Sequence, residues 1–323
     1  MIRITVIVMV LGALGLTGLG MWWSMQPQKF DVTENAEELL EDQLNADIDE
    51  DTVAGVPGTL SVATAARVAQ TLLEKPGGYL HNDMIPPGVL MDNMPSWEYG
   101  VLTELRDSVR SFRNDFSRSQ TQSLENPSLK RADSEFNFDA KSWFLPSAEE
   151  EYGTGVTELQ DFVVALHTSS DPSARFYARA DNLSAYLAVV EKRLGSYGQR
   201  LASSVGDPEL TAAIGGGAQV IDQTPWHRVD NVFYEARGYS WALLHMMKAL
   251  AVDFREVLAN KNAQVSLQQI IRDLELATIP KWSPVVLNGH GFGVLANHSL
   301  VLASYIARAN AAVLDLRVLL QTG

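Results

Sequence analysis

The sequence predicts an all-α fold, an antiparallel helical bundle domain on an N-terminal single-pass transmembrane helix. The chain begins with one long apolar run, and apolar residues in most of the remainder recur three and four positions apart, the period of a helix. No segment alternates apolar and polar residues over five or more positions with β-branched enrichment, as an exposed strand would. The 323 residues divide accordingly into a transmembrane anchor (1–23), an acidic flexible tether (24–60) and a helical domain (61–323).

The apolar run Ile2–Trp23 has the length of a membrane span. As a helix it rises about 33 Å, enough to cross a hydrocarbon core of about 30 Å. Arg3 is its only charged side chain, and it ends in two tryptophans, residues that favour the bilayer–water boundary. A cleaved secretory signal is the alternative, because Gly18-Leu19-Gly20 has small-x-small spacing, but the apolar stretch before it reaches the upper limit for a signal. An uncleaved anchor is the preferred interpretation.

The flanking charges orient the span only weakly. Arg3 and the terminal amine lie at its start and Lys29 follows it, so the positive-inside signal is nearly balanced. The favoured topology keeps the N-terminus inside and exports the large domain, which predicts a single-pass protein of the bacterial inner membrane with a periplasmic domain. The chain has no cysteine, which excludes a lipoprotein anchor and thiolate chemistry and suits an oxidising compartment.

The net charge of −14 is concentrated in one block, residues 31–51, which holds ten acidic residues and no basic one. Like-charged blocks of this kind are usually disordered. Together with Pro27 and the turn Gly55-Val56-Pro57-Gly58, this block predicts a flexible spacer rather than a packed element. The rest of the chain has no basic face, so no nucleic-acid partner is expected.

Helical periodicity covers most of residues 61–323. The two longest apolar seams, in 176–201 and 229–257, alternate steps of three and four and are expected to bury each other. Ser147 has the spacing of a helix N-cap. Helices are expected over residues 61–75, 96–116, 147–166, 176–201, 229–257, 267–277 and 295–320.

Three non-helical segments carry most of the candidate binding residues: Pro76–Gly100, Thr224–Asp230 and Pro280–His298. Each joins or caps long helices, and in a bundle such connections collect at the ends. We expect the three segments to meet at one end and to form a partly apolar binding surface. Its candidate residues are His81, Asp83, Trp97, Trp226, His227, Trp282 and His290.

No motif specifies a reaction. The chain lacks a Gly-x-Ser-x-Gly elbow, and Gly215-Gly216-Gly217 lacks the lysine of a P-loop. The histidines do not have metal-ligand spacing: His290 and His298 are separated by a glycine-rich turn, and His245 lies on an apolar helix face. The sequence therefore predicts no catalytic residue, no metal site and no cofactor.

Three segments carry a family resemblance: GGYLHNDMIPPGVLMDNMPSWEYGVL, SEFNFDAKSWFLPSAEEEYGTG and TPWHRVDNVFYEARGYSWALLH. With the anchor, they resemble a family of uncharacterised proteobacterial inner-membrane proteins, domain of unknown function 2333. The resemblance implies an inner-membrane protein with a helical exported domain, and it implies no catalytic or ligand residue.

Two functions remain open. The first is a membrane-anchored interaction or scaffold protein of the cell envelope, whose partners are the lipid bilayer and an envelope protein. The second is an envelope hydrolase or metal-dependent enzyme that uses the Trp/His/Asn-rich loops. Ala13 and Thr17 form a small-xxx-small pair in the anchor, which leaves a homo-oligomer open. We favour the first, because helical bundles without a recognisable nucleophile or metal set more often bind than react.

Overall fold

The computed structural model describes residues 2–118, 125–204, 223–281, 283, 285–289 and 295–322. All regular structure in these residues is helical, so the predicted all-α fold is confirmed. The β-pairing in this part of the chain consists of two isolated bridges, Trp143 with Ser147 and Asn288 with Asn297.

The helices follow the chain in this order: α1 (Ile2–Trp23), α2 (Val32–Leu44), α3 (Glu50–Gly55), α4 (Thr59–Glu74), α5 (Asn93–Ser111), α6 (Pro127–Phe136), α7 (Ala148–Thr168), α8 (Ala180–Ala202), α10 (Val229–Asp253), α11 (Arg255–Asn260), α12 (Gln264–Ala277) and α13 (His298–Thr322). Three short turns complete the described elements: η1 (Gly88–Leu90), the π-helical η2 (Phe112–Phe116) and η3 (Trp226–Arg228).

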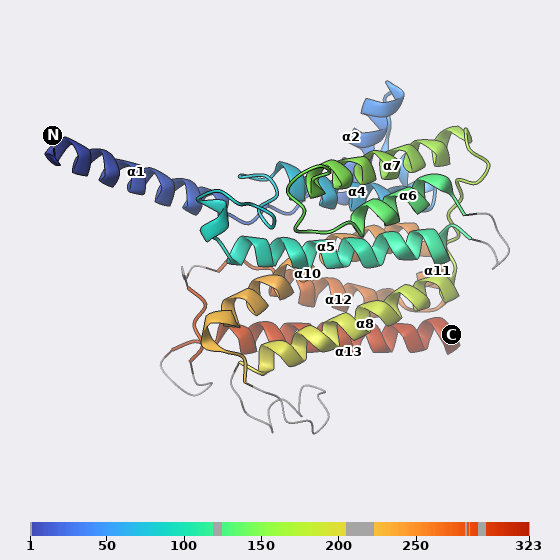
Figure 1. Cartoon of the computed structure of the whole chain (residues 1–323). Helices are drawn as coiled ribbons and strands as arrows, with labels where there is room; N and C mark the ends of the chain where they lie inside the picture. Colours follow the sequence, from blue (N-terminus) through green and yellow to red (C-terminus); the bar gives the residue numbers. More distant parts are fainter. Residues whose placement is uncertain are drawn as a thin grey trace.

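Helix α1 projects from one end of the bundle, roughly along the direction of the long helices (Figure 1). It is long and apolar enough to cross a membrane, and none of the residues Arg3–Trp23 that form its apolar window is buried. Helix α13 passes the same test of length and composition, but nearly half of its window is buried. Its buried face includes Leu302, Ile306, Val313 and Leu316, which pack in the common core, as expected of a core helix.

The residues expected to form a flexible tether instead form packed helices. Asp31 caps α2 by accepting the backbone N–H groups of Thr33 and Glu34 at 2.8 and 3.2 Å. Ala36 and Leu40 are fully buried, and α2 packs against α4. The expectation of a flexible, unpacked stretch is therefore wrong for α2. An apolar stripe at helical spacing lies among the acidic residues, and counting charge alone hides it.

The helices that carry the two longest apolar seams, α8 and α10, pack mainly against other helices and not against each other. Helix α8 packs mainly along α13 and α10 mainly along α5, while the contact between α8 and α10 is smaller. Helices α8 and α13 run antiparallel, since Gln321 meets Ser184 and Arg317 meets Glu191. A seam predicts that a helix face is buried, but it does not specify the partner.

Helices α5 and α10 lie side by side in parallel, unlike the antiparallel pairs around them. Asn231 donates to Ser96 at 3.0 Å near their starts, and the rings of Phe116 and Phe254 lie 5.5 Å apart just beyond their ends. Two glycines permit the close approach. A Cβ on Gly100 would lie 2.0 Å from the Glu235 carbonyl oxygen, and one on Gly238 would lie 1.9 Å from the Trp97 carbonyl oxygen.

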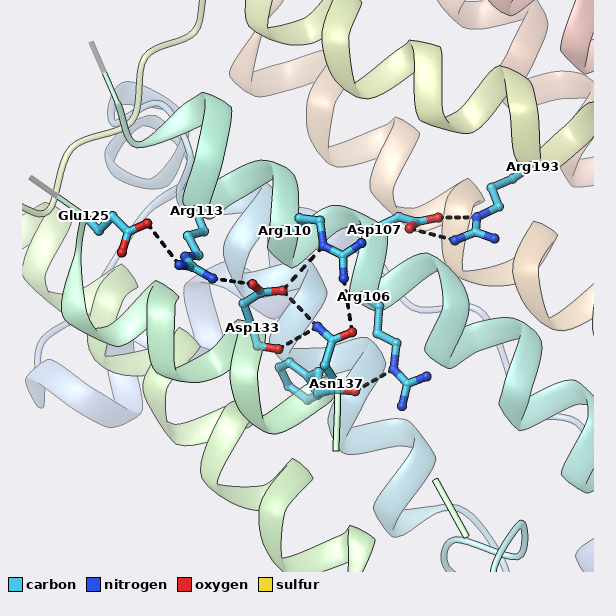
Figure 2. A network of polar contacts seen from close by, with 9 residues as sticks. Arg106, Asp107, Arg110, Arg113, Glu125, Asp133, Asn137 and Arg193 are labelled. Atoms are coloured by element: carbon cyan, nitrogen blue, oxygen red, sulfur yellow. Dashed lines mark hydrogen bonds and ion pairs between the residues drawn. The ribbon is translucent and has the colours of Figure 1, made fainter. Parts of the chain in front are cut away.

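Polar contacts of α5 and of η2, which follows it, fasten them to α6 and α8 (Figure 2). Asp107 accepts two hydrogen bonds from Arg193 of α8, at 2.6 and 3.0 Å. Arg113 donates to Asp133 of α6 at 2.8 Å, and Arg106 donates to a carbonyl at the end of α6 at 2.6 Å. The bidentate pair of Arg193 and Asp107 fixes the relative orientation of α8 and α5 as well as their distance.

Candidate functional site

The structure brings parts of all three predicted segments together. A cavity of about 260 Å³ lies where α5 and α10 begin, at the end of the bundle from which α1 projects (Figure 1). We call it the loop pocket. It is lined by Asn93 from the first segment, by Trp226, His227, Val229 and Asp230 from the second, and by Val285, Val286 and Asn288 from the third.

The predicted residues of the first segment do not line this cavity. The ring of His81 stacks on that of Tyr99, and its Nδ1 lies 2.9 Å from the Pro95 carbonyl oxygen. Burial lowers the pKa of His81 and raises that of Asp83. Trp97 is 1% exposed and packs on Trp241 between α5 and α10, so its role is in the core.

Of the other candidate residues, two line the loop pocket and two lie outside the described part of the chain. Trp226 is 88% exposed, and its ring lies 5.9 Å from that of His227. His227 and Asp230 line the loop pocket together. Trp282 and His290 lie outside the described residues. Of the predicted set, the loop pocket therefore unites Trp226 and His227, and it adds Asp230, Asn93 and Asn288.

A larger cavity, of about 800 Å³, was not predicted from the sequence. We call it the anchor pocket, because one wall is the chain that directly follows α1. Its full lining is Ser24, Met25, Gln26, Pro27, Gln28, Lys29, Tyr234, Arg237, Trp241, Thr278, Pro280 and Lys281. Tyr234, Arg237 and Trp241 share one face of α10, as their spacing of three and four requires.

Arg237 is the most deeply buried cation of the anchor pocket, with 5% of its surface exposed. Its guanidinium donates to the carbonyls of Ala277 and Ile279 at 3.1 and 2.9 Å and to Oε1 of Gln26 at 3.0 Å. These bonds close the C-terminal end of α12, where carbonyl dipoles favour a positive charge. Burial lowers the pKa of Arg237.

Two lysines join Arg237 at the same cavity. Lys281 donates to the carbonyls of Ser283 and Val285 at 2.5 and 3.2 Å, and its Nζ lies 5.8 Å from the centre of the Tyr234 ring. Lys29 lies 3.5 Å from the Glu275 carbonyl oxygen. Burial, together with nearby positive charge, lowers the pKa of both lysines, and at Lys29 the charge of Glu275 acts in the opposite direction. A chain of net charge −14 therefore gathers three cations around one cavity.

The comparisons with known proteins place the whole chain in one group. A family model described as an uncharacterized protein conserved in bacteria, DUF2333, matches residues 1–323. The chain belongs to this family. No curated protein and no solved structure matches it. The DUF2333 match includes α1 and α2 as well as the bundle, and the family description assigns no activity.

The part of this DUF2333 protein that the structure describes contains no group of three or more His, Cys, Asp or Glu side chains arranged to hold a metal ion. The anchor pocket escaped prediction because its three walls lie far apart in the sequence. One signal was present. Arg237 sits in the apolar seam of α10 between Phe233 and Ser240, and a charged residue on a buried face commonly marks a functional or specifically paired position.

Proposed function

We propose that this DUF2333 protein is a single-pass protein of the bacterial inner membrane, and that its periplasmic helical domain is an interaction or scaffold module seated on the bilayer surface. The observation that carries the proposal is α1, an apolar helix of membrane-spanning length with no buried residue in its apolar window. Exposing such a surface to water is costly, and a bilayer removes that cost.

The domain is joined closely to α1 rather than held at a distance. A Cβ on Gly77 would lie 2.7 Å from the Trp23 ring, so the indole rests on this glycine. A Cβ on Gly20 would lie 3.6 Å from Cβ of Pro87. Gly20 is about 4.5 Å from Trp23 along the helix. The loop that contains Pro87 therefore reaches the level of the last turn of α1, where the bilayer interface would lie.

Two connected loops expose large apolar side chains, and Pro87 of the first loop lies close to Gly20 of α1. The loop before α5 exposes Met84, Ile85, Val89 and Leu90, and the loop before α7 exposes Trp143, Phe144 and Leu145. The side chain of Asn82 joins the two loops by donating to the Ser142 carbonyl at 2.7 Å. Contiguous exposed apolar side chains mark protein or membrane contacts, and tryptophan favours the membrane interface. We infer that these loops touch the bilayer.

Binding, rather than catalysis, fits the roles of the buried acids. Glu98 pairs with Lys75 at 2.5 Å, Glu104 accepts a hydrogen bond from Tyr186, and the first turn of α4 donates to Asp253. Burial raises the pKa of Glu98, Glu104 and Asp253 to about 7, 8 and 6. Each group joins helices, so these pKa shifts have a structural explanation.

One observation favours the second candidate, an envelope enzyme. His227 and Asp230 line the loop pocket with Asn93 and Asn288, which is a set of residues able to move a proton and orient a substrate. A His227→Ala variant separates the two candidates. An interaction module predicts no accumulation of an unprocessed envelope substrate in this variant, whereas an enzyme predicts such accumulation.

Topology is tested with a single reporter, because the chain contains no cysteine. Helix α7 ends at the end of the bundle opposite α1 (Figure 1), and Ser170 is exposed two residues after its last residue, Thr168. A Ser170→Cys variant should react with a membrane-impermeant maleimide in intact spheroplasts. Reaction only after lysis would place the domain in the cytoplasm and contradict the periplasmic orientation.

A further inference from the structure

The cations of the anchor pocket lack acidic partners. In the described ranges, no carboxylate lies within ion-pair distance of Lys29, Arg237 or Lys281, whereas eleven other cationic side chains make such pairs. Three unpaired cations at a single cavity form a site of positive potential.

The same cavity leaves two buried donors without an acceptor. Nε of Arg237 and Nε1 of Trp241 are both buried and make no hydrogen bond in the described structure. The two residues lie one turn apart on α10, and both line the anchor pocket. A buried donor without a partner costs free energy. An anion that reached these two atoms would be a suitable acceptor.

An apolar cavity adjoins the anchor pocket. Its volume is about 330 Å³, and Arg237 and Lys281 belong to the linings of both cavities. Apolar side chains of α12, α13 and the loop between them form part of its lining, namely Leu276, Ala277, Ile279, Val301 and Leu302. The rest of the lining is Phe233, Ser283, His298 and Tyr305. A ligand with a charged head and an apolar tail would find a matching surface for each part.

We propose that the anchor pocket binds a phosphate group through Lys29, Arg237 and Lys281. The group belongs either to the headgroup of an anionic phospholipid or to a free phosphate. The lipid as source rests on the proposed membrane anchoring, because residues 24–29 directly follow Trp23 and would lie at the headgroup level. The phosphate site itself rests on the unpaired cations and the unpaired donors, and it holds for either orientation of the domain.

The experiment uses the full chain purified in a nonionic detergent. Native mass spectrometry measures lipid adducts in micelles containing equal amounts of phosphatidylglycerol and phosphatidylcholine, and calorimetry measures binding of inorganic phosphate. Preferred phosphatidylglycerol adducts without phosphate binding identify the lipid as ligand. Phosphate binding as tight as that of the lipid identifies free phosphate. No preference for the anionic lipid together with no phosphate binding overturns the proposal.

Four substitutions make the test specific. Lys29→Gln removes one exposed cation of the site and should weaken binding roughly tenfold, the loss expected for one charge-assisted contact. Lys29→Arg keeps the charge and should bind within about twofold of the native chain. Lys192→Gln, on the exposed face of α8, is the matched control and should have no effect. Native affinity in Lys29→Gln and in a parallel Lys281→Gln variant would overturn the proposal.

Because the measurement is made in detergent, it does not depend on membrane retention. If the chain fails to stay with membranes but still binds phosphate through Lys29, the anchoring is wrong and the site is right. Membrane retention without phosphate or lipid binding would support the anchoring and contradict the phosphate site. Arg237 is not substituted, since its bonds to the end of α12 would confound binding with folding.

Discussion

Phe30 lies flat on His245, with ring centroids 4.1 Å apart and planes 11° from parallel. The backbone N–H of Phe30 donates to Nε2 of His245 at 3.2 Å, and Nδ1 of the same ring lies 2.8 Å from the Trp241 carbonyl oxygen. This tautomer has Nδ1 donating and Nε2 accepting, so the ring is neutral. The contact ties the chain that follows α1 to the middle of α10.

The first prediction concerns acid stability. Burial lowers the pKa of His245 to about 4, from 6.5 for an ordinary histidine. Between these values the unfolded chain binds a proton that the folded chain does not, so this residue makes the folded chain less stable as the pH falls. The effect is about 1.4 kcal/mol per pH unit.

Urea unfolding of the native chain and of His245→Gln measures this effect. The native chain should lose about 2 kcal/mol relative to the variant between pH 6.5 and 5, because only the native chain has this group to titrate. A stability difference that stays constant over this interval would show that His245 is protonated as easily in the folded chain as in the unfolded one.

The second prediction has the opposite sign. Burial raises the pKa of Glu104 to about 8, from 4.5, so the folded chain keeps a proton that the unfolded chain releases. The contribution of Glu104 to stability should therefore decline as the pH rises from 4.5 to 8, by about 1.4 kcal/mol per unit. The free energy of unfolding of Glu104→Gln should therefore rise relative to that of the native chain over this range.

The control for Glu104→Gln is Glu74→Gln, at an exposed position near the end of α4. Removing a surface charge there should change the free energy of unfolding by less than about 0.5 kcal/mol. If Glu104→Gln and Glu74→Gln show the same dependence on pH, the buried carboxyl is not protonated in the folded chain.

The third prediction tests the parallel contact of α5 and α10. Gly238→Ala would place a methyl group 1.9 Å from the Trp97 carbonyl oxygen, so the helices must separate. The expected cost is at least about 2 kcal/mol of unfolding free energy. Gly153→Ala is the matched control, because a Cβ there meets nothing within 4 Å. In the helix interior it should raise stability by about 0.5–1 kcal/mol. Equal effects of the two substitutions would contradict the close packing.

The fourth prediction concerns the exposed apolar loops. Leu90→Cys, labelled with an environment-sensitive fluorophore, should show blue-shifted emission in proteoliposomes and should be quenched by a lipid-attached quencher. Ser170→Cys, labelled in the same way, should show the emission of a fluorophore in an aqueous environment, because it follows α7, which ends at the opposite end of the bundle. Fluorophore emission typical of an aqueous environment at both positions would mean that the loops do not contact the bilayer.

The helical class of the fold could be predicted because side-chain periodicity is a local property. The steps of three and four that define α8 and α10 are visible in the sequence, and Ser147 caps α7 by accepting the N–H of Glu150 at 3.2 Å. The helix α2 was missed because Ala36 and Leu40 lie among acidic residues. The stripe that they form is short, and its burial depends on the presence of α4.

The candidate site could be predicted only in part. The meeting of three loops at one end follows from bundle geometry. Whether each side chain is buried or exposed does not. Trp97 follows Ser96 at the start of α5 and was expected at the surface, yet α10 covers it. The anchor pocket combines residues from positions 24–29, 234–241 and 278–281. No local pattern brings those three stretches together.

Membrane retention of the intact chain tests the central claim most directly. Membranes from cells that produce the native sequence are washed with high salt and then with alkaline carbonate, and the mass of the protein in each fraction is measured. We predict the full-length chain, with Ile2–Trp23 still attached, in the membrane pellet. A soluble form that begins near Met21 would show that α1 is a cleaved signal, and it would contradict both the anchoring and the seating of the domain on the bilayer.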